Sequence, residues 1–148
     1  MQKCTLALGC FWKPEENFKN KPGIIQTEVG YAGGHNPKVT YEEVCTGNSG
    51  HAEVVQLIFD EKVISYKKIL DLFFKMHDPT QKDMQYPDVG TQYRSEIFYE
   101  NETQKKEALE IFEEYNEKHD GKVQTNISKI KNYCRAEEYH QNYIEKNR

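Results

Sequence analysis

The stretch Cys4-Thr5-Leu6-Ala7-Leu8-Gly9-Cys10-Phe11-Trp12 is the point from which the rest of the chain can be interpreted. Its first five residues are mostly apolar and stop at a glycine, which is typical of a buried strand. Pro14-Glu15-Glu16 follows, a composition that favours a first helical turn, because proline needs no amide donor there and acids suit the positive end of the helix dipole. Cys10 is therefore expected at a strand-to-helix turn.

A thiol in that position is expected to be reactive. The helix dipole and the unpaired amides at a helix start stabilise a thiolate, which lowers the pKa of the thiol. The alternative is a buried cysteine packed beside Phe11 and Trp12, because free cysteine is among the most buried residue types. The stretch alone leaves both interpretations open.

Length and charge limit the possible functions. A chain of 148 residues is expected to form a single domain, residues 1–148, that buries about two thirds of its unfolded surface. The net charge is −4, and its basic residues are mixed with acidic ones, so we expect neither a nucleic-acid partner nor a membrane partner. We find no signal-peptide pattern and no stretch of membrane-spanning length, which predicts a cytoplasmic protein. We expect it to be a monomer.

The cysteines favour redox or nucleophilic chemistry over structural bonding. The four of them, Cys4, Cys10, Cys45 and Cys134, have no repeated spacing and no CxxC pair. That pattern argues against a disulfide framework and against a zinc ribbon, so no metal is expected. The pattern fits a protein whose cysteines are all reduced thiols, one of them reactive, better than it fits a disulfide-bonded or zinc-binding protein.

The remaining chain alternates predicted strands and helices. After the first helix, which ends near Asn20 before Lys21-Pro22-Gly23, strands are expected over 24–31, 51–59, 95–99 and 123–127. Helices are expected after the caps Ser65 and Asn101 or Thr103, and over 136–146. The helix that follows Asn101 or Thr103 is expected to bury Leu109 together with four other apolar residues.

Two polar stretches interrupt this alternation, residues 35–50 and 77–94. The first is expected to carry one helical turn around Tyr41 to Val44, and the second too few apolar residues for buried regular structure. Loops longer than about 12 residues are uncommon unless they are functional. The sequence therefore predicts an α+β fold, a two-layer α/β sandwich with a mixed sheet in the manner of a ferredoxin-like plait, and two long functional loops.

The polar candidates around Cys10 suit the binding of a small uncharged oxygen. Tyr41, Glu53, Asp88 and Tyr93 lie in the two loops or at their edges, and Phe11 and Trp12 stand beside the thiol. Phenols and a carboxylic acid can hydrogen-bond an oxygen while aromatic rings enclose a methyl group, and a glutamic acid with a raised pKa can deliver a proton.

Seven motifs, in order, resemble those of peptide methionine sulfoxide reductases of the A type. They are Gly9-Cys10-Phe11-Trp12, Val29-Gly30-Tyr31-Ala32-Gly33-Gly34, Tyr41-Glu42-Glu43-Val44-Cys45, Gly50-His51-Ala52-Glu53-Val54-Val55, His77-Asp78-Pro79-Thr80, Gly90-Thr91-Gln92-Tyr93-Arg94-Ser95 and Ala136-Glu137-Glu138-Tyr139-His140-Gln141. The resemblance covers nearly the whole chain. It implies protein repair under oxidative stress by thiol-dependent reduction of methionine S-sulfoxide, a reversal that this enzyme class performs.

The resemblance also implies roles, residue by residue. Cys10 matches the nucleophile that attacks the sulfoxide sulfur and becomes a sulfenic acid, and Glu53 matches the acid that protonates the oxygen. Tyr41 and Tyr93 match phenols that bind that oxygen, and Asp88 matches a carboxylate that polarises the site. Phe11 and Trp12 match the wall around the substrate methyl. No bound cofactor is implied, only an external thiol reductant, thioredoxin or dithiothreitol.

Two departures from the family pattern affect this picture. Lys13-Pro14 stands where the family commonly has glycine, which puts a charge beside the opening. Many members carry resolving cysteines in a glycine-rich tail, whereas this sequence has no cysteine after Cys134. The resolving thiol could thus be Cys134, Cys4, Cys45 or an external one. We predict Cys134, because it precedes a motif that in this family lies near the active site.

Two other classes of function remain open from the residues. A thiol hydrolase or transferase would need a histidine paired with Cys10, and His51, His77 and His140 are available. A peptide-binding module would keep the aromatic wall and tolerate loss of the thiol. We expect His51 and His140 to be structural, and Cys45 to be an inert loop thiol.

Overall fold

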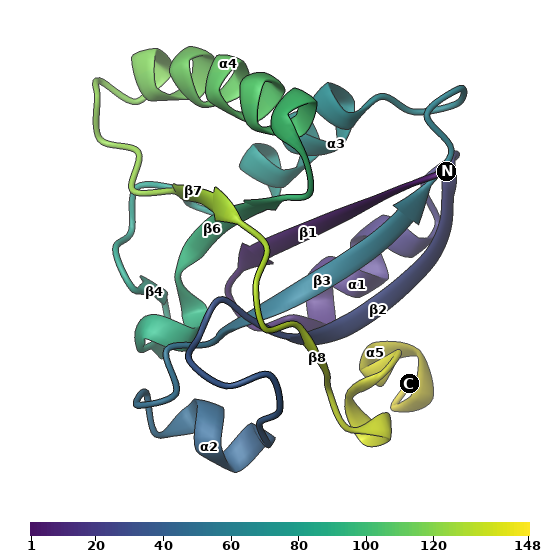
Figure 1. Cartoon of the computed structure of the whole chain (residues 1–148), viewed down its shortest axis with the longest axis vertical. Helices are drawn as coiled ribbons and strands as arrows, with labels where there is room; N and C mark the ends of the chain where they lie inside the picture. Colours follow the sequence, from purple (N-terminus) through teal and green to yellow (C-terminus); the bar gives the residue numbers. More distant parts are fainter.

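The computed structural model describes all 148 residues of the chain (Figure 1). The elements, in order, are β1 (Gln2–Leu8), α1 (Trp12–Lys19), β2 (Ile24–Ala32), α2 (Tyr41–Cys45), β3 (Ala52–Phe59), α3 (Tyr66–Met76), β4 (Met84–Gln85), β5 (Asp88–Val89), η1 (Thr91–Tyr93), β6 (Ser95–Tyr99), α4 (Glu102–Lys118), β7 (Asn126–Lys129), β8 (Cys134–Arg135), η2 (Glu138–His140) and α5 (Tyr143–Lys146).

One six-stranded sheet organises the molecule, in the order β7-β6-β1-β3-β2-β8. All neighbours are antiparallel except β6 and β7, which are parallel, so the predicted mixed sheet is confirmed. The four central strands are connected as β1-α1-β2-β3-α3-β6. Strands β7 and β8 extend both edges, which makes the sheet larger than the four strands of the predicted plait.

The helices cover one face of the sheet and build the main core there. Cys4, Leu6 and Leu8 of β1 point into the same buried cluster as residues of α1, α3 and α4. Within it, the ring of Phe74 from α3 stacks on Tyr115 from α4, with ring centroids 4.7 Å apart. Figure 1 shows α3 and α4 together at one end of the molecule, with α2 and α5 at the other.

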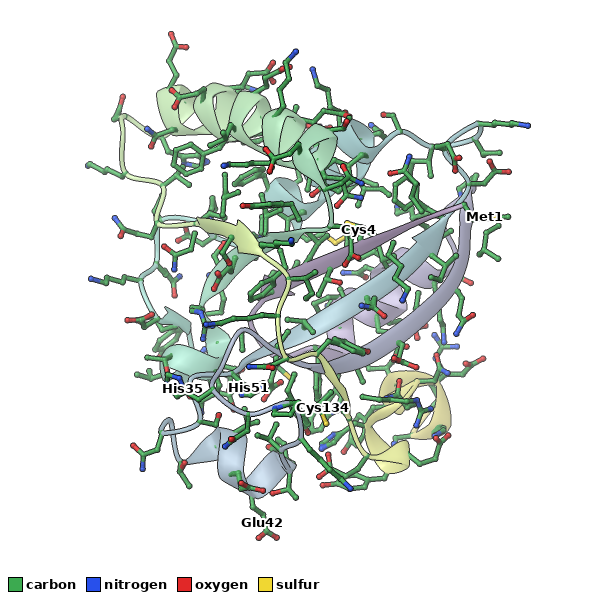
Figure 2. The ribbon with its side chains drawn as sticks, viewed as in Figure 1. Met1, Cys4, His35, Glu42, His51 and Cys134 are labelled. Carbon is green, nitrogen blue, oxygen red and sulfur yellow. The ribbon has the colours of Figure 1, made fainter.

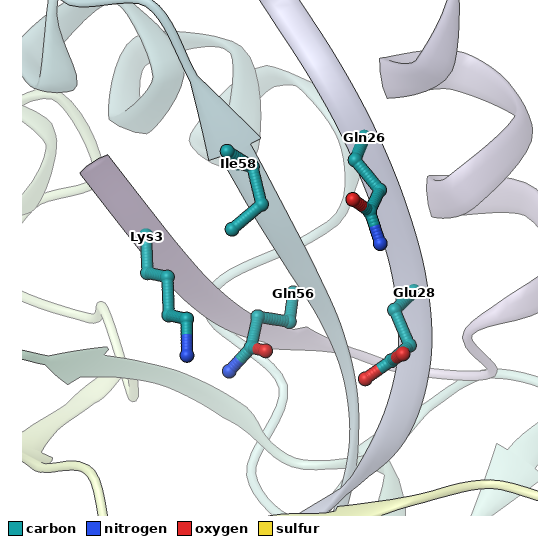
Figure 3. Close-up of a pocket in the computed structure, with 5 residues that line it drawn as sticks. All are labelled: Lys3, Gln26, Glu28, Gln56 and Ile58. Carbon is teal, nitrogen blue, oxygen red and sulfur yellow. The ribbon is translucent and has the colours of Figure 1, made fainter. Parts of the chain in front are cut away.

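The opposite face of the sheet is partly open and polar. Lys3, Gln26, Glu28, Gln56 and Ile58 line a depression there of about 240 Å³ (Figure 3). Alternate residues of a strand point to opposite faces, so these polar positions interleave with the apolar positions of the core. The two-layer arrangement predicted from the sequence is confirmed.

Local signals in the sequence place most helix starts correctly. Ser65 caps α3 by accepting a hydrogen bond from the amide of Lys68 at 3.0 Å, and Asn101, not Thr103, caps α4. The helical turn expected around Tyr41 is α2, which begins with a capping box between Thr40 and Glu43. Leu109 of α4 was predicted to be buried, but it is 44% exposed, because it lies on the outer side of that helix.

The predicted C-terminal helix over 136–146 is wrong. Only Tyr143–Lys146 is α-helical, and residues 138–140 form a single 3₁₀ turn. The side-chain amide of Gln141 accepts from the amide of Val29 at 2.9 Å and donates to the Val29 carbonyl at 2.8 Å, so it pairs with β2 as a strand would. Asn142 then takes a left-handed conformation, with φ of 52°, that interrupts the helix.

The expected final strand over 123–127 also needs correction. It lies at 126–129 as β7, because the amide of Val123 bonds to the side chain of Asn116 and pairing with β6 begins only at Asn126. It is not the final strand, since β8 follows it and pairs with β2. Residues 77–94 contain the short hairpin β4–β5 and the turn η1, but no strand residue of the hairpin is buried, in line with the few apolar residues there. No helix in the protein has the length and apolar character needed to cross a membrane.

Candidate active site

Cys10 lies where the sequence places it, between the end of β1 and the start of α1. Gly9 makes this turn possible, since its φ of +92° is in the region that L side chains rarely adopt, and a Cβ there would meet the side chain of Gln85 at 2.9 Å. The thiol is partly exposed, so a substrate can reach it. The predicted strand-to-helix turn is confirmed.

The predicted direction of the Cys10 pKa is wrong. Burial, with a smaller contribution from the nearby carboxyl groups of Glu53 and Asp88, raises the pKa of this thiol to about 12. The backbone amide of Trp12, at the start of α1, acts in the expected direction and lowers the pKa, but its effect is smaller than that of burial. The resting thiol therefore keeps its proton at neutral pH.

Glu53 provides a neutral acid beside this thiol. Its side chain is buried, 2% exposed, on β3, and its Oε1 accepts a hydrogen bond from the amide of Phe11 at 3.3 Å. Burial raises the pKa of Glu53, the Phe11 amide lowers it and the charge of Asp88 raises it, and together they bring the pKa to about 8. At pH 7 the carboxyl group is thus mostly protonated and can donate a proton.

Two phenols, Tyr93 and Tyr41, complete the polar part of the site together with Asp88 on β5. Tyr93 belongs to η1, and burial raises its pKa to about 12, with Glu53, Asp88 and Cys10 among the groups that add to the effect. Tyr41 begins α2, and its pKa is raised first by a hydrogen bond with the side chain of Cys45 and then by burial. Both phenols therefore keep their protons as donors at neutral pH.

An aromatic wall borders the other side of Cys10. It consists of Phe11, which is 2% exposed, the half-buried Trp12, and the rings that pack on them, those of Tyr31, His140 and Tyr143. Trp12 stacks on Tyr143 with ring centroids 3.7 Å apart and an interplanar angle of 8°. Tyr41 also reaches this wall, with its ring centroid 4.6 Å from that of His140.

The C-terminal segment holds both the aromatic wall and the start of α2, where Tyr41 lies. The carboxylate of Glu137 accepts from the hydroxyl of Tyr31 at 2.8 Å and from the backbone amide of Tyr41 at 2.9 Å, so it joins β2 to α2. The buried carboxylate of Glu15 on α1 accepts from the amide of Asn142 at 2.7 Å. These bonds connect the segment to three elements of the site.

The two loops of the site are joined through Arg94. Its guanidinium donates to the carbonyls of Gly50 and Thr91 at 3.0 Å each and forms a salt bridge of 2.7 Å with Glu96. Thr91 and Gly50 belong to the different polar stretches predicted to be functional. The structure thus brings both stretches to the same side of the sheet.

The other three cysteines occupy different environments. Figure 2 shows Cys4 on β1 and Cys134 at the end of the molecule that also holds α2. Cys4 is fully buried in the main core. Cys134 is half-buried on β8, packs against the cluster that contains Phe11, and places its Sγ 3.6 Å from the carbonyl of Val39. Cys45 is exposed and ends the short helix α2 that begins with Tyr41.

The histidines that a cysteine hydrolase would need are bonded to other groups. His51 interacts with the carbonyls of Ser49 and Asn132, and His77 with the carbonyl of Phe73 and the hydroxyl of Ser95. His140 accepts from the indole of Trp12. No group of three or more His, Cys, Asp or Glu side chains is arranged to hold a metal ion.

Several residues of this site were not found from the sequence. Glu137, His140 and Gln141 lie within a motif that was noted, but their separate contacts depend on partners more than 90 positions away along the chain. Glu15 and Tyr143 had no distinguishing signal, since acidic residues near helix starts and tyrosines near helix ends are common.

Comparison with known proteins gives consistent matches over nearly the full chain. A family model described as "Peptide methionine sulfoxide reductase" matches residues 2–148. A curated relative from Pelagibacter ubique, "Peptide methionine sulfoxide reductase MsrA", is 57% identical over 146 residues, which covers 99% of each chain.

Solved structures match in the same way. Mxr1 from Saccharomyces cerevisiae in its reduced form has a TM-score of 0.95 and 42% identity, and the match covers 99% of this chain and 85% of that one. The complex of Mxr1 with Trx2 has a TM-score of 0.68 and 31% identity, over 96% of this chain and 84% of that one.

Proposed function

Because this chain belongs to the peptide methionine sulfoxide reductase family, we propose that its own residues reduce methionine S-sulfoxide by the following route. The protein is an oxidoreductase that converts methionine sulfoxide to methionine. The epimer, the intermediate and the residue roles are part of the proposal. The observation that carries it is a buried carboxyl group, Glu53, with a pKa of about 8 beside the Cys10 thiol.

The first step requires both a nucleophile and an acid. Sulfoxide sulfur is a poor electrophile until its oxygen is protonated or strongly hydrogen-bonded, and a positioned acid typically contributes ~10²–10⁴-fold in rate. Glu53 gives its proton to the oxygen while Cys10 attacks the sulfur, and it recovers a proton from the thiol. The net change is one thiol plus one sulfoxide to one sulfenic acid plus one thioether, which balances without an outside proton.

The remaining polar groups hold the oxygen in place. Tyr41 and Tyr93 keep their protons at neutral pH, so each can donate a hydrogen bond to it. Asp88 on β5 adds to the rise in the pKa of Glu53, which helps to keep that acid protonated. Phe11 and Trp12 enclose the substrate methyl group, an apolar contact that selects a sulfoxide with a small substituent.

The sulfenic acid on Cys10 is then resolved by a second thiol. We assign this step to Cys134, whose half-buried position near the cluster of Phe11 supports a short route to Cys10. Condensation forms the Cys10–Cys134 disulfide and releases water. An external dithiol of the thioredoxin type then exchanges with the disulfide, as the solved complex of the yeast relative with Trx2 supports.

The setting of the enzyme is also part of the proposal. Residues 1–148 act as a single reductase domain and a monomer, in the cytoplasm, in protein repair after oxidation. The four free thiols suit a reducing compartment. No bound cofactor is needed, because the external thiol supplies both electrons.

The proposed activity predicts strict stereochemistry with a simple reductant. Incubation with a peptide that contains one epimer of methionine sulfoxide, plus dithiothreitol, should yield methionine from the S epimer and almost none from the R epimer. Amino-acid analysis of the product measures this. Equal conversion of both epimers would contradict the proposed selectivity, and no conversion of either would contradict the activity.

The resolving step predicts one specific disulfide. After one equivalent of substrate without reductant, peptide mapping should find Cys10 bonded to Cys134, and thiol counting should show the loss of both thiols. A direct disulfide needs the Cα atoms of the two cysteines within about 7 Å of each other. Any movement that brings Cys134 to Cys10 has to come from β8, which is only two residues long.

Variants at the half-buried Cys134 and the exposed Cys45 separate the alternatives. Cys134→Ser should leave a sulfenic acid on Cys10, while Cys45→Ser should leave the disulfide unchanged. A sulfenic acid that persists in the unmodified protein, with Cys134 still free, would mean that the external thiol attacks Cys10 directly. A Cys10–Cys45 disulfide would transfer the role to Cys45.

A further inference from the structure

The indole of Trp12 has one hydrogen-bond partner in the protein, and it is His140. Trp12 Nε1 lies 3.0 Å from His140 Nδ1. An indole N–H is a donor only, so Nδ1 of His140 must be the acceptor and must carry no proton. The proton of the neutral ring is therefore on Nε2, and the contact fixes which tautomer is present.

The same ring is held in a closed aromatic environment. His140 is 1% exposed, and its ring centroid lies 4.6 Å from that of Tyr41 and 4.1 Å from that of Tyr139. Its Nε2 is buried and has no hydrogen-bond partner among the protein atoms. A buried donor without an acceptor is unfavourable, and such groups are rare unless the surrounding structure requires them. Here the proton must stay on Nε2, because Nδ1 accepts the hydrogen bond from Trp12.

We propose that neutral His140 is the positioning residue that holds the Trp12 indole in its substrate-binding orientation, and that protonation of His140 releases it. A proton on Nδ1 would place two N–H donors against each other, so the bond to Trp12 would be lost. His140 is a positioning residue and not a catalytic one, because it acts on the sulfoxide through Trp12. This inference rests on the proposed role of Trp12 in the methyl-binding wall.

The groups around His140 favour the neutral ring. Trp12 and Phe11 face it from the start of α1, and neither titrates. Tyr41 of α2 and Tyr139 of its own segment present neutral phenols, since the pKa of each is raised. Glu137 is the one anionic group that acts on the ring, and it raises the pKa of His140 less than burial lowers it.

The expected consequence is a pH-dependent affinity. Above the His140 pKa, which lies below the ordinary value for histidine, the ring is neutral and Trp12 is held. Below it, KM for the sulfoxide should rise by about three- to tenfold, the effect of one lost neutral hydrogen bond. The rate at saturating substrate should change less, because Cys10 and Glu53 do not contact the indole N–H.

Trp12 is the only tryptophan of the chain, so its fluorescence reports on this bond directly. We would titrate the fluorescence of the unmodified protein between about pH 4 and pH 7, below the range in which Glu53 titrates, with far-ultraviolet circular dichroism to confirm that it stays folded. One proton should account for the change in emission. KM and kcat for a peptide sulfoxide would be measured over the same range.

Two substitutions distinguish positioning from packing. His140→Asn keeps an acceptor near the place of Nδ1 but cannot titrate, so its fluorescence and KM should be independent of pH, with KM below that of His140→Leu. His140→Leu removes the acceptor and should raise KM at every pH. His119→Asn, at the end of α4, is the matched control and should titrate like the unmodified protein.

Three results would overturn the inference. They are a fluorescence transition that persists in His140→Asn, an unchanged KM in His140→Leu, and equal losses in both variants, which would indicate packing alone. If the protein failed to reduce sulfoxide at all, the proposed function would fail, but the fluorescence titration would still test the bond between His140 and Trp12.

Discussion

Cys10→Ser is expected to abolish sulfoxide reduction, with a loss of at least ~10³-fold, while the fold is retained. Serine is similar in size and Cys10 is only partly buried, so packing should change little. A hydroxyl attacks sulfur far more weakly than a thiol and cannot be oxidised to a sulfenic acid. The measurement is methionine release with dithiothreitol in excess, together with the thermal unfolding midpoint.

The matched control for this variant is Cys45→Ser. It removes another accessible thiol, on the helix that begins with Tyr41, and replaces it with a hydroxyl of similar size. It should retain most of the activity. Turnover above a few per cent in Cys10→Ser would show that another group attacks the sulfur. Loss of the cooperative unfolding transition would mean that the variant tests folding and not chemistry, and Cys10→Ala would then replace it.

Glu53→Gln is expected to slow formation of the sulfenic acid by ~10²–10⁴-fold while substrate affinity changes much less. The amide keeps the shape of the neutral acid and can still donate a hydrogen bond to the sulfoxide oxygen, but it cannot transfer a proton. Single-turnover kinetics at several substrate concentrations separate the chemical rate constant from binding. Glu138→Gln, an exposed carboxylate on η2, is the control and should behave like the unmodified enzyme.

The pH dependence gives this prediction a second test. Glu53 acts as an acid only while it holds its proton, so the chemical rate constant should be constant below its pKa and fall as pH rises through about 8. In Glu53→Gln this fall should disappear, because the amide does not titrate. A chemical step as fast as in the unmodified enzyme would assign the acid role to another group, of which Tyr93 is a candidate because Glu53, Asp88 and Cys10 all raise its pKa.

The sequence by itself determined the elements whose signals are local. Strand β1, the turn at Gly9 and the caps Ser65 and Asn101 follow from a short apolar run, a glycine and side chains that bond within three residues. The two polar stretches were also identified as site walls from composition alone. Such features depend on neighbours in the chain, so they can be predicted without a partner surface.

Only the tertiary structure decided how the C-terminal segment runs. Residues 136–142 have helical composition, but the side chain of Gln141 forms hydrogen bonds with the backbone of Val29, and Glu137 accepts hydrogen bonds from Tyr31 and Tyr41. These bonds replace the hydrogen bonds of a helix and add the burial of His140. The contribution of such contacts exceeds the small differences of helix propensity, which are below about 1 kcal/mol per residue.

The tertiary structure also decided the protonation of the site. From the sequence, the start of a helix predicted a lowered pKa for Cys10, and a raised one for Glu53 was a requirement of the chemistry. Desolvation and nearby carboxyl groups raise both. Burial of a charge is set by everything packed around it, and an interaction of one amide with a thiolate does not offset it. The residue types of the site could thus be predicted from the sequence, but their charge states required the fold.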